Sequence, residues 1–547
     1  MKKKGDKVKI SLPNQLAKKD NNKNKIYNLS FLLLISSFLS SLLFFDFSLL
    51  AAADDAGYLI SGHNFWSSGT WPGDFAPLFC IILGFFVKLI GYKIVVLKIL
   101  PLLFFLVFIY YFWNFYSKKL DILIALPVIL MVIFNPSIIT MASTLYAETF
   151  FMALSILTIR YFHLYFEEIE PSTNAKVRRD FVFKTDIKRV LGLAFFVLAL
   201  YLSRTVGLLI AGIIFLFFIL HKKFVAALAF TSSMILVVML FVGTKKLVWD
   251  IPVFANSQLS GLRNIDFYDA SKGQEKFTGY LVRLRDNSKL YISNHLLRGL
   301  GFIQFNSKKQ SEKLVYAIFV VSIFLFLAVF KKNKYIAFAG LYGFGMCILS
   351  FIILQVYWNQ ERYIFPFVPF ILIFWIGSIY LLLSQYFNKS APLRVALTII
   401  LPFITLMTYS KQVNFIRLQE GLTGNYFYGQ PIEWINYYQS FKFVAQNEYK
   451  DKLTAVRKPS LAKIYSGGID FYGISTTNEA TDIDKFLLRL KNDKVELYIL
   501  DQCLGTFGNI YKLVESKYPG TFTIIKQIGE KEKAAYICKI NYPSQLK

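Results

Sequence analysis

Long runs of apolar residues, separated by short polar connections, occupy most of the 547-residue chain. A run of roughly 18 or more apolar residues with few charges is long enough to cross a bilayer as a helix. The pattern predicts about eleven membrane spans, although several runs are shorter than this length. They are expected at 28–48, 94–114, 121–136, 146–163, 190–203, 205–220, 224–243, 314–330, 335–357, 363–385 and 393–410. The stretch 190–220 also fits one long broken helix.

A different pattern begins after residue 410, where polar residues return and the apolar runs become short. Runs rich in β-branched and aromatic residues, bounded by polar ones, are typical of strands. Strands are expected at 452–458, 495–501, 522–528 and 534–540, and helices at 433–449 and 480–493. Strands that alternate with helices at this spacing predict a small α/β domain.

The composition agrees with a membrane protein. Hydrophobic residues make up 55% of the chain and charged residues 17%, whereas about a quarter of an ordinary soluble domain is charged. Much of the net charge of +27 comes from Lys and Arg beside the apolar runs, where such residues set the orientation and meet anionic lipid headgroups. No nucleic-acid-binding module accompanies this charge, so we predict no nucleic-acid partner.

Lys and Arg in the short connections predict the orientation, because they are retained on the cytoplasmic side. The N-terminal segment is basic, and basic connections recur after alternate spans. These are "SKK" (117–119), "KVRRDFVFKTDIKR" (176–189), "HKK" (221–223), "KKNK" (331–334) and "NKSAPLR" (388–394). All of them fall on one side, which we predict to be the cytoplasm. The basic loop 244–313 is then extracytoplasmic, which is acceptable because long loops follow the charge rule poorly.

We therefore predict an α-helical polytopic membrane protein with a C-terminal extracytoplasmic α/β domain. Its parts are a basic cytoplasmic N-terminus (1–27), a transmembrane domain (28–410) with outer loops at 49–93 and 244–313, and the α/β domain (411–547). Residues 1–50 also have features of a signal peptide, ending at "LLAAADDA". Their apolar run is longer than that of most signal peptides, which favours a retained first span.

The apolar stretch 75–91 in the first outer loop contains Pro77 and Lys88. If it crossed the membrane, every later basic connection would face outward. We therefore interpret it as one or two helices that lie at the outer membrane surface. In the α/β domain, Cys503 and Cys538 leave their pairing open, because neither a zinc-ligand spacing nor a disulfide framework is visible.

Two adjacent carboxylates, Asp54 and Asp55, follow the first apolar run at the predicted outer face. A single Asp there would be explained as a helix cap, but a pair followed by Tyr58 and surface helices favours a functional site. A carboxylate can act as a general base on a hydroxyl or amine nucleophile. Carboxylate oxygens also hold divalent cations, so the couplet is the candidate ligand set if a metal ion is bound. The sequence does not decide metal dependence.

Three cations are predicted at the same face. Arg204 and Arg362 stand at the ends of apolar runs, and Lys88 lies in the surface stretch. An ionisable residue in such apolar sequence marks a functional site by default, and guanidinium and ammonium groups bind phosphate. The simpler alternative for Arg362 is an ion pair with a neighbouring acid or extension toward the headgroups. No acid lies close to Arg204 in sequence.

Five short motifs resemble, in their order and predicted sidedness, those of the GT-C superfamily of membrane glycosyltransferases. The protein O-mannosyltransferase and lipid A aminoarabinose transferase families are the most similar in pattern. The motifs are "DDAGY" (54–58), "APLF" (76–79), "NPSIITMASTLYAETFF" (135–151), "LSRTVGLL" (202–209) and "ERYIFPFVPF" (361–370). Each motif is short, and together they span roughly residues 25–410.

The resemblance implies an enzyme that takes a sugar from a polyprenyl-phosphate carrier and transfers it to a glycan, lipid or protein acceptor at the outer face. It implies that Asp54 is the base or acceptor-positioning group, with Asp55 as its companion, and that Arg204 and Arg362 hold the carrier phosphate. The second residue of the couplet is Asp here, where Glu is commoner. Tyr58, Glu148 and Glu361 are expected to support the site. Some relatives bind a divalent metal ion.

Two other classes of protein fit the many spans. One is a lipid-linked sugar flippase or other transporter, although transporters more often place charges mid-span in paired halves. The other is a non-catalytic envelope assembly protein whose α/β domain binds partners. Membrane lipids are partners in every case, and the Lys-, Asn- and Ile-rich composition favours a bacterial inner membrane.

Overall fold

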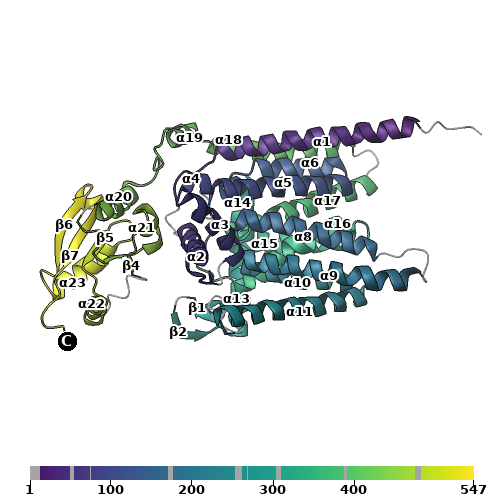
Figure 1. Ribbon diagram of the computed structural model, residues 1–547. Coiled ribbons are helices and arrows are strands. Elements are labelled where there is room, and N and C mark those ends of the chain that lie inside the picture. Colours follow the sequence, from purple (N-terminus) through teal and green to yellow (C-terminus); the bar gives the residue numbers. More distant parts are fainter. Residues whose placement is uncertain are drawn as a thin grey trace, which may run out of the picture.

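The computed structural model describes residues 13–49, 54–73, 76–169, 177–252, 261–267, 269–302, 310–386, 391–446, 448–474 and 482–546. The chain forms a bundle of long helices, and a smaller C-terminal domain is attached to one end of it (Figure 1). We call this the domain end of the bundle and the other the opposite end. The predicted basic segment 1–12 and the first residues of the basic connections at 176 and 388–390 lie outside the described residues.

Each predicted apolar range falls on a helix. The bundle contains α1 (Pro13–Leu42), α5 (Ile99–Lys119), α6 (Ile122–Ile133), α8 (Glu148–Glu168), α9 (Val177–Ser203), α10 (Leu209–Leu220), α11 (Phe224–Trp249), α15 (Glu312–Val329), α16 (Lys334–Ile353), α17 (Val368–Tyr386) and α18 (Ala391–Gln412). Among the described residues, six helices are long and apolar enough to cross a membrane, or seven if a bent pair is one span. The chain is thus a multi-pass membrane protein, but the predicted count of about eleven is not confirmed.

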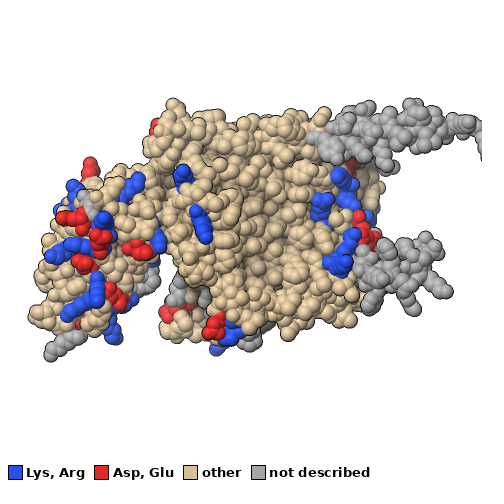
Figure 2. Space-filling model, viewed as in Figure 1, with Lys and Arg blue, Asp and Glu red and all other residues tan. Residues whose placement is uncertain are grey.

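The distribution of charge matches a bundle embedded in lipid. On the face shown in Figure 2, charged side chains gather on the C-terminal domain and in a band at the opposite end, while the bundle surface between them carries few charges. In that band Lys119 pairs with Glu167 at 2.8 Å, and the Lys223 ammonium donates to the carbonyl of Ile169 at 3.0 Å. The basic connections around 119 and 223 therefore lie on one side, as predicted.

Two short helices, α2 (Asp54–Ser68) and α3 (Pro77–Ile90), cross the domain end of the bundle instead of extending it (Figure 1). They pack so closely that a Cβ atom on Gly62 would lie 2.1 Å from the carbonyl oxygen of Cys80. A Cβ atom on Gly84 would lie 2.1 Å from the backbone of Gly62. The stretch predicted as surface helices is therefore one helix, α3, held against α2 by direct backbone contact and followed by the short α4 (Ile94–Leu97).

The long loop after α11 also lies at the domain end. It forms β1 (Asn264–Asp266), β2 (Asp269–Gln274), α13 (Phe277–Leu290), a π-helical turn (Tyr291–Leu296) and α14 (Leu297–Gly299). Arg283 holds this segment together, because its guanidinium is only 3% exposed and donates to the carbonyls of Leu262 and Asn264 at 2.8 and 2.6 Å. Glu275 neutralises it at 2.9 Å.

The C-terminal domain is built on a five-stranded sheet with strand order β4-β3-β5-β7-β6. The strands are β3 (Thr454–Val456), β4 (Tyr472–Gly473), β5 (Leu497–Asp501), β6 (Phe522–Ile528) and β7 (Ala535–Ile540), and the helices are α20 (Ile432–Gln446), α21 (Pro459–Tyr465), α22 (Ile483–Asn492) and α23 (Lys512–Lys517). Strand β3 runs parallel to β4 and β5, whereas β7 is antiparallel to β5 and β6. The predicted strands and helices are confirmed, and β4 was not predicted. Cys503 and Cys538 are both free thiols.

The domain is docked on α2 and α3 through a shared apolar core. Leu59 and Leu83 from these helices belong to the same buried cluster as Tyr438 of α20 and Leu461 of α21. A polar contact reinforces it, since the backbone N–H of Leu49 donates to the Tyr465 hydroxyl at 3.1 Å. The position of the C-terminal domain is therefore fixed against the start of α2.

A buried charge cluster lies beside this interface. Lys98 is fully buried and donates to the backbone carbonyls of Asp46, at 2.7 Å, and Ser48. Arg417, on α19 (Phe415–Leu422), pairs with the Asp46 carboxylate at 2.8 Å. Burial alone would raise the pKa of Asp46, but the charges of Lys98 and Arg417 outweigh it, so the pKa lies below its ordinary value. The cluster ties the end of α1 to the linker that precedes the C-terminal domain.

The crossing of α2 and α3 gives a direct test of this architecture. We expect Gly62→Ala to lower the free energy of unfolding by about 2 kcal/mol or more, because the added methyl overlaps the α3 backbone and the two helices must separate. The matched control is Gly57→Ala on the same helix, where nothing lies within 4 Å of the added atom. It should be neutral or stabilising by about 0.5–1 kcal/mol. Thermal unfolding in detergent measures both, and equal effects would contradict the close crossing.

Candidate active site

Four predicted site residues from distant parts of the chain meet at the domain end of the bundle. The Arg362 guanidinium lies 2.5 Å from the Asp54 carboxylate and 3.9 Å from that of Glu148. The same Glu148 oxygen accepts a hydrogen bond from Arg204 at 2.5 Å. The result is a continuous chain of alternating charge, Asp54–Arg362–Glu148–Arg204. We call it the acid–guanidinium chain.

Exposure is highest at Asp54 and lowest at Glu148, in the interior of this chain. The Asp54 side chain is 45% exposed, Arg362 is 12% exposed and Glu148 only 3% exposed. Glu148 Oε2 and Arg362 Nε are buried without a hydrogen-bond partner. Buried polar atoms are rarely left unpaired unless a ligand or a movement satisfies them. The arrangement therefore has an accessible carboxylate at one end and spare hydrogen-bonding capacity inside.

Arg204 is placed by a break between two helices. After α9 ends at Ser203, the residue adopts an extended conformation before the short turn Thr205–Leu208. The turn folds back onto α9 so tightly that a Cβ atom on Gly207 would lie 2.3 Å from the carbonyl oxygen of Leu200. Only glycine fits there, which explains why the motif "LSRTVGLL" places a glycine three residues after the arginine.

Glu148 is the first residue of α8 and follows a bent connection. Helix α6 and the helical segment 136–143 meet at 57°, where Pro136 begins the second segment and Asn135 caps it through hydrogen bonds from Ser137 and Ile138. The bend carries the chain across the domain end and lets α8 start there. A carboxylate at a helix N-terminus is further stabilised by the helix dipole.

Arg362 lies in a 3₁₀ turn (Glu361–Tyr363) that precedes α17. Its neighbour Glu361 anchors the turn, because it accepts hydrogen bonds from Arg298 and from the Ser137 hydroxyl, the latter at 3.1 Å. His295 extends the network by pairing with Asn359 at 2.6 Å. Glu361 therefore supports the site by holding Arg362 in position. His295 lies on the π-helical turn, a feature often found at functional sites.

Tyrosine rings line the acid–guanidinium chain. The Arg362 guanidinium lies 4.5 Å from the centre of the Tyr146 ring, and Arg204 lies 5.7 Å from that of Tyr363. Tyr58 on α2 meets Tyr146 edge-on at 6.5 Å. Burial, and then the charge of Glu148, raise the pKa of Tyr58, so its hydroxyl remains a neutral donor. The rings shield the ionic contacts from water and strengthen them.

The acidic couplet is divided between two environments. Asp54 is exposed and pairs with Arg362, whereas Asp55 is fully buried and accepts a hydrogen bond from the N–H of Ala56 at 3.0 Å. The charge of Asp55 acts on Lys98 and on Tyr438 and Tyr465 of the C-terminal domain. The two carboxylates therefore differ in exposure and in their direct contacts, and only Asp54 pairs with Arg362.

Lys88 is not brought into the acid–guanidinium chain. Its ammonium donates to the backbone carbonyl of Trp66 at 3.2 Å. Trp66 lies near the C-terminal end of α2, whereas Asp54 begins that helix. A helix rises about 1.5 Å per residue, so the two positions are separated by most of the length of α2.

The candidate metal ligands do not form a coordination site in this arrangement. No three His, Cys, Asp or Glu side chains gather to hold a metal ion in the part of the chain that the structure describes. Asp54 is held by Arg362, and Asp55 is turned away from it. The couplet therefore does not present a shared set of oxygen ligands to a divalent cation.

Several site residues were not predicted from the sequence. Tyr146 and Tyr363 lie inside the quoted motifs, close to Glu148 and Arg362 in sequence. Aromatic residues near a buried cation often pack on it, so this proximity could have predicted them. Arg298 and His295 gave no such signal, because their partners Glu361 and Asn359 are more than 60 positions away.

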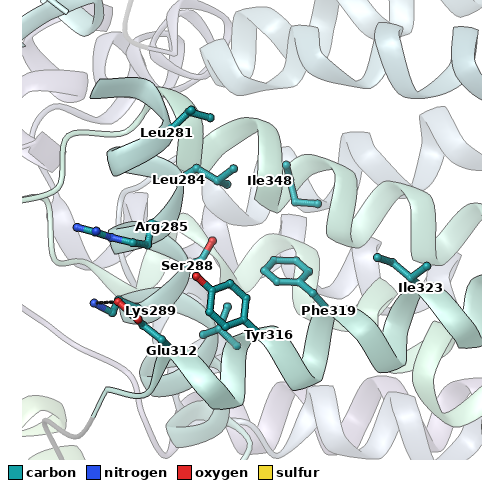
Figure 3. Close-up of a pocket in the computed structure, with 11 residues that line it drawn as sticks. Leu281, Leu284, Arg285, Ser288, Lys289, Glu312, Tyr316, Phe319, Ile323 and Ile348 are labelled. Atoms are coloured by element: carbon teal, nitrogen blue, oxygen red, sulfur yellow. Dashed lines mark ion pairs between the residues drawn. The ribbon is translucent and has the colours of Figure 1, made fainter. Parts of the chain in front are cut away.

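A separate apolar cavity of about 350 Å³ opens between α13, α15 and α16 (Figure 3). Its wall consists mainly of apolar side chains, including Leu281, Leu284, Phe319 and Ile323. Lys289 and Glu312 pair at one edge of the cavity. Helix α13 leads directly into the π-helical turn that carries His295. The cavity thus lies on the same segment as the network that supports Arg362.

No family model and no curated protein matches the chain, but solved structures share its fold. ArnT from Cupriavidus metallidurans bound to undecaprenyl phosphate is similar with a TM-score of 0.57 and 12% identity, over 95% of this chain and 99% of that one. Its apo form gives a TM-score of 0.54 with 14% identity, over 94% and 98%. The Archaeoglobus fulgidus oligosaccharyltransferase AglB, in complex with an inhibitory peptide and a dolichol-phosphate, gives 0.52 with 11% identity, over 94% and 74%.

Both neighbours are members of the GT-C superfamily, so the resemblance inferred from the sequence motifs is confirmed at the level of the fold. The similarity extends over the bundle and the C-terminal domain together, because it covers nearly the whole of this chain. At these identities it shows the fold and does not assign the site residues.

Glu148 is the residue whose removal tests the acid–guanidinium chain. We expect Glu148→Gln to lower the free energy of unfolding by about 3 kcal/mol, because two partly buried guanidinium groups lose their shared counter-charge. Glu168→Gln is the matched control on the other end of α8, where the ion pair with Arg189 is largely exposed. Its effect should stay within about 0.5 kcal/mol. Equal denaturation midpoints for the two variants would show that Glu148 is not the central counter-charge.

Proposed function

We propose that the protein is a glycosyltransferase that moves a sugar from a polyprenyl-phosphate donor to an acceptor at the extracytoplasmic face of the membrane. The observation that carries the proposal is the acid–guanidinium chain, which brings an accessible carboxylate and two arginines together at one end of a membrane-embedded bundle. In this proposal the domain end faces outward and the N-terminus is cytoplasmic. A bacterial inner membrane fits this arrangement.

The structural neighbours support the same chemistry. Their structures contain undecaprenyl phosphate in ArnT and a dolichol-phosphate in AglB, which are both polyprenyl-type phosphates. An acceptor peptide is tethered to the Archaeoglobus fulgidus oligosaccharyltransferase in another structure of the same fold. We extend to this chain only the class of reaction, transfer of a sugar from a lipid carrier to an acceptor.

Asp54 is proposed as the base or acceptor-positioning group, because it is the exposed carboxylate of the chain. The acceptor hydroxyl or amine would give its proton to Asp54 as its oxygen or nitrogen attacks the anomeric carbon of the sugar. The bond between that carbon and the phosphate oxygen breaks, and the polyprenyl phosphate leaves with the electron pair. Arg362 and Arg204 would stabilise the charge on the leaving phosphate through charge-assisted hydrogen bonds.

The ion pair between Asp54 and Arg362 gives this mechanism an order of events. While Arg362 holds Asp54, the carboxylate is engaged in an ion pair and is not available to an acceptor. A carrier phosphate that binds Arg362 would compete with Asp54 for the guanidinium and release the carboxylate for the acceptor. Glu148 would remain in place, keeping both arginines aligned. Asp55 and Tyr58 would help to hold α2 in place. Lys88 would bind lipid phosphate at the edge of the membrane.

The long carrier chain needs an apolar surface that leads away from its phosphate. The cavity between α13, α15 and α16 has this character, because its lining is mainly apolar. We propose it as one surface for the lipid chain. The cavity is connected to the arginines through α13, which continues into the π-helical turn, and through Glu361, the neighbour of Arg362.

The test is turnover by the purified full-length protein with radiolabelled polyprenyl-phosphate sugars of several kinds, with the consumption of each followed. Asp54→Asn should lower the rate by about 100- to 10,000-fold, because a general base is lost. It should keep or strengthen the binding of undecaprenyl phosphate, since Arg362 is released. Asp55→Asn is the neighbouring control and should retain most of the turnover if the protein folds.

Two other results would identify the alternatives. Movement of the labelled lipid across the bilayer of a liposome without cleavage of the glycosidic bond would identify a flippase. Absence of both cleavage and lipid binding would indicate a non-catalytic assembly protein. Unchanged turnover in the Asp54→Asn variant would refute the role of this carboxylate.

A further inference from the structure

The connection between β3 and α21 in the C-terminal domain carries two cations, Arg457 and Lys458. The proposed reaction gives neither of them a role. From β3 the chain passes to β4 on one side, and from β4 it returns to β5 on the other side of β3. Where connections leave in opposite directions, the carboxyl ends of parallel strands enclose a crevice that commonly binds ligands. Arg457 and Lys458 stand at the carboxyl end of β3, and Gln502 and Cys503 follow β5.

This end of the sheet faces the start of α2. Helix α21, which follows Lys458, is the part of the C-terminal domain that lies nearest α2 (Figure 1). Leu461 and Ala462 of α21 share a buried cluster with Ala56 and Leu59 of α2. Lys458 therefore immediately precedes the helix that packs on the first turns of α2, just after the acidic couplet.

The charges confirm this placement. Both Asp54 and Asp55 act electrostatically on Lys458, and Arg457 acts on it as well. Burial and the charge of Arg457 lower the pKa of Lys458, and the two carboxylates oppose that shift. Arg457 is itself fixed, since its guanidinium donates to the carbonyl of Ile474 at 3.0 Å. Lys458 is thus a cation of the C-terminal domain that is near enough to the couplet for both carboxylates to act on its charge.

This position suits the acceptor better than the carrier. The arginines proposed to hold the carrier phosphate belong to the bundle, as Arg204 follows α9 and Arg362 precedes α17. Lys458 approaches the couplet from the C-terminal domain. In a direct displacement the nucleophile arrives from the side opposite to the leaving group, so a cation on the domain side meets the molecule that carries the nucleophile.

We infer that Lys458 is a specificity-determining residue that receives an anionic group, phosphate or carboxylate, of the acceptor beside Asp54. The inference rests on the proposed function. It identifies the acceptor as an anionic molecule that enters between α2 and the loop 457–458. Arg457 positions this loop.

The experiment measures binding of two probes to the full-length protein in nanodiscs. One probe is radiolabelled inorganic phosphate, added with saturating undecaprenyl phosphate so that the arginines of the bundle are occupied. The other is undecaprenyl phosphate itself. Lys458→Gln should weaken phosphate binding about tenfold, because a charge-assisted hydrogen bond is lost, and should leave undecaprenyl phosphate binding within about twofold. Lys458→Arg should restore phosphate binding.

The matched control is Lys463→Gln, on the same helix, where the ammonium pairs with Asp470 at 2.6 Å. It should bind both probes like the wild type. Lys458→Met, which keeps the apolar stem, provides a second neutral variant if the glutamine variant does not fold.

Unchanged phosphate binding in the neutral Lys458 variants would overturn the inference. So would a loss of undecaprenyl phosphate binding as large as that of Arg362→Gln, because it would assign Lys458 to the carrier. If the wild type binds phosphate through Lys458 but does not bind undecaprenyl phosphate, the proposed function fails and the anion site remains. The two failures are therefore distinguishable.

Discussion

The buried carboxylate of Glu148 is the interaction on which the arrangement of the site depends. Arg204 and Arg362 come from segments almost 160 positions apart, and both approach a region that is largely excluded from water. Two guanidinium groups that approach the same carboxylate oxygen would repel each other if that anion did not lie between them. Glu148 supplies that anion, because α8 begins at the domain end and directs its first side chain between the two. Glu148 therefore offsets the cost of placing two guanidinium groups in this partly buried region.

Helix α2 links this charge arrangement to the rest of the molecule. Its first residue, Asp54, closes the acid–guanidinium chain, and its next residue, Asp55, is buried on the side of Lys98 and the C-terminal domain. The same helix is pressed onto α3 at Gly62 and Gly84 and onto α21 through apolar contacts. One short helix thus contacts both the C-terminal domain and the accessible carboxylate's partner, Arg362.

The proposed reaction and the proposed acceptor site use cations from different parts of the molecule. Arg204 and Arg362 belong to the bundle, and Lys458 belongs to the C-terminal domain. In the proposed reaction, a membrane-bound donor would meet the first set and a water-borne or surface-borne acceptor the second. The physical separation of the cations would let one carboxylate serve a reaction between two anionic substrates without exposing either to the charge of the other.

The sequence determined the elements of the fold but not their assembly. Long hydrophobic runs predicted the helices of the bundle, and short runs rich in β-branched and aromatic residues predicted four of the five strands, because burial in lipid or in a sheet favours such residues over a local stretch. Strand β4, only two residues long, is too short to show such a run. The charge pattern also placed the basic connections around 119 and 223 at one end.

Arg204 and Arg362 were predicted because they interrupt apolar sequence, and Glu148 because of the family resemblance, and the structure brings these three residues together with Asp54. The sequence did not reveal that Asp54 and Asp55 serve different surroundings, that Lys88 lies at the far end of α2, or that Lys458 approaches from the C-terminal domain. These facts depend on helix rotation, on the close crossing at Gly62 and on domain docking. Such relations are set by packing between distant segments, and a linear pattern of residues carries no record of them.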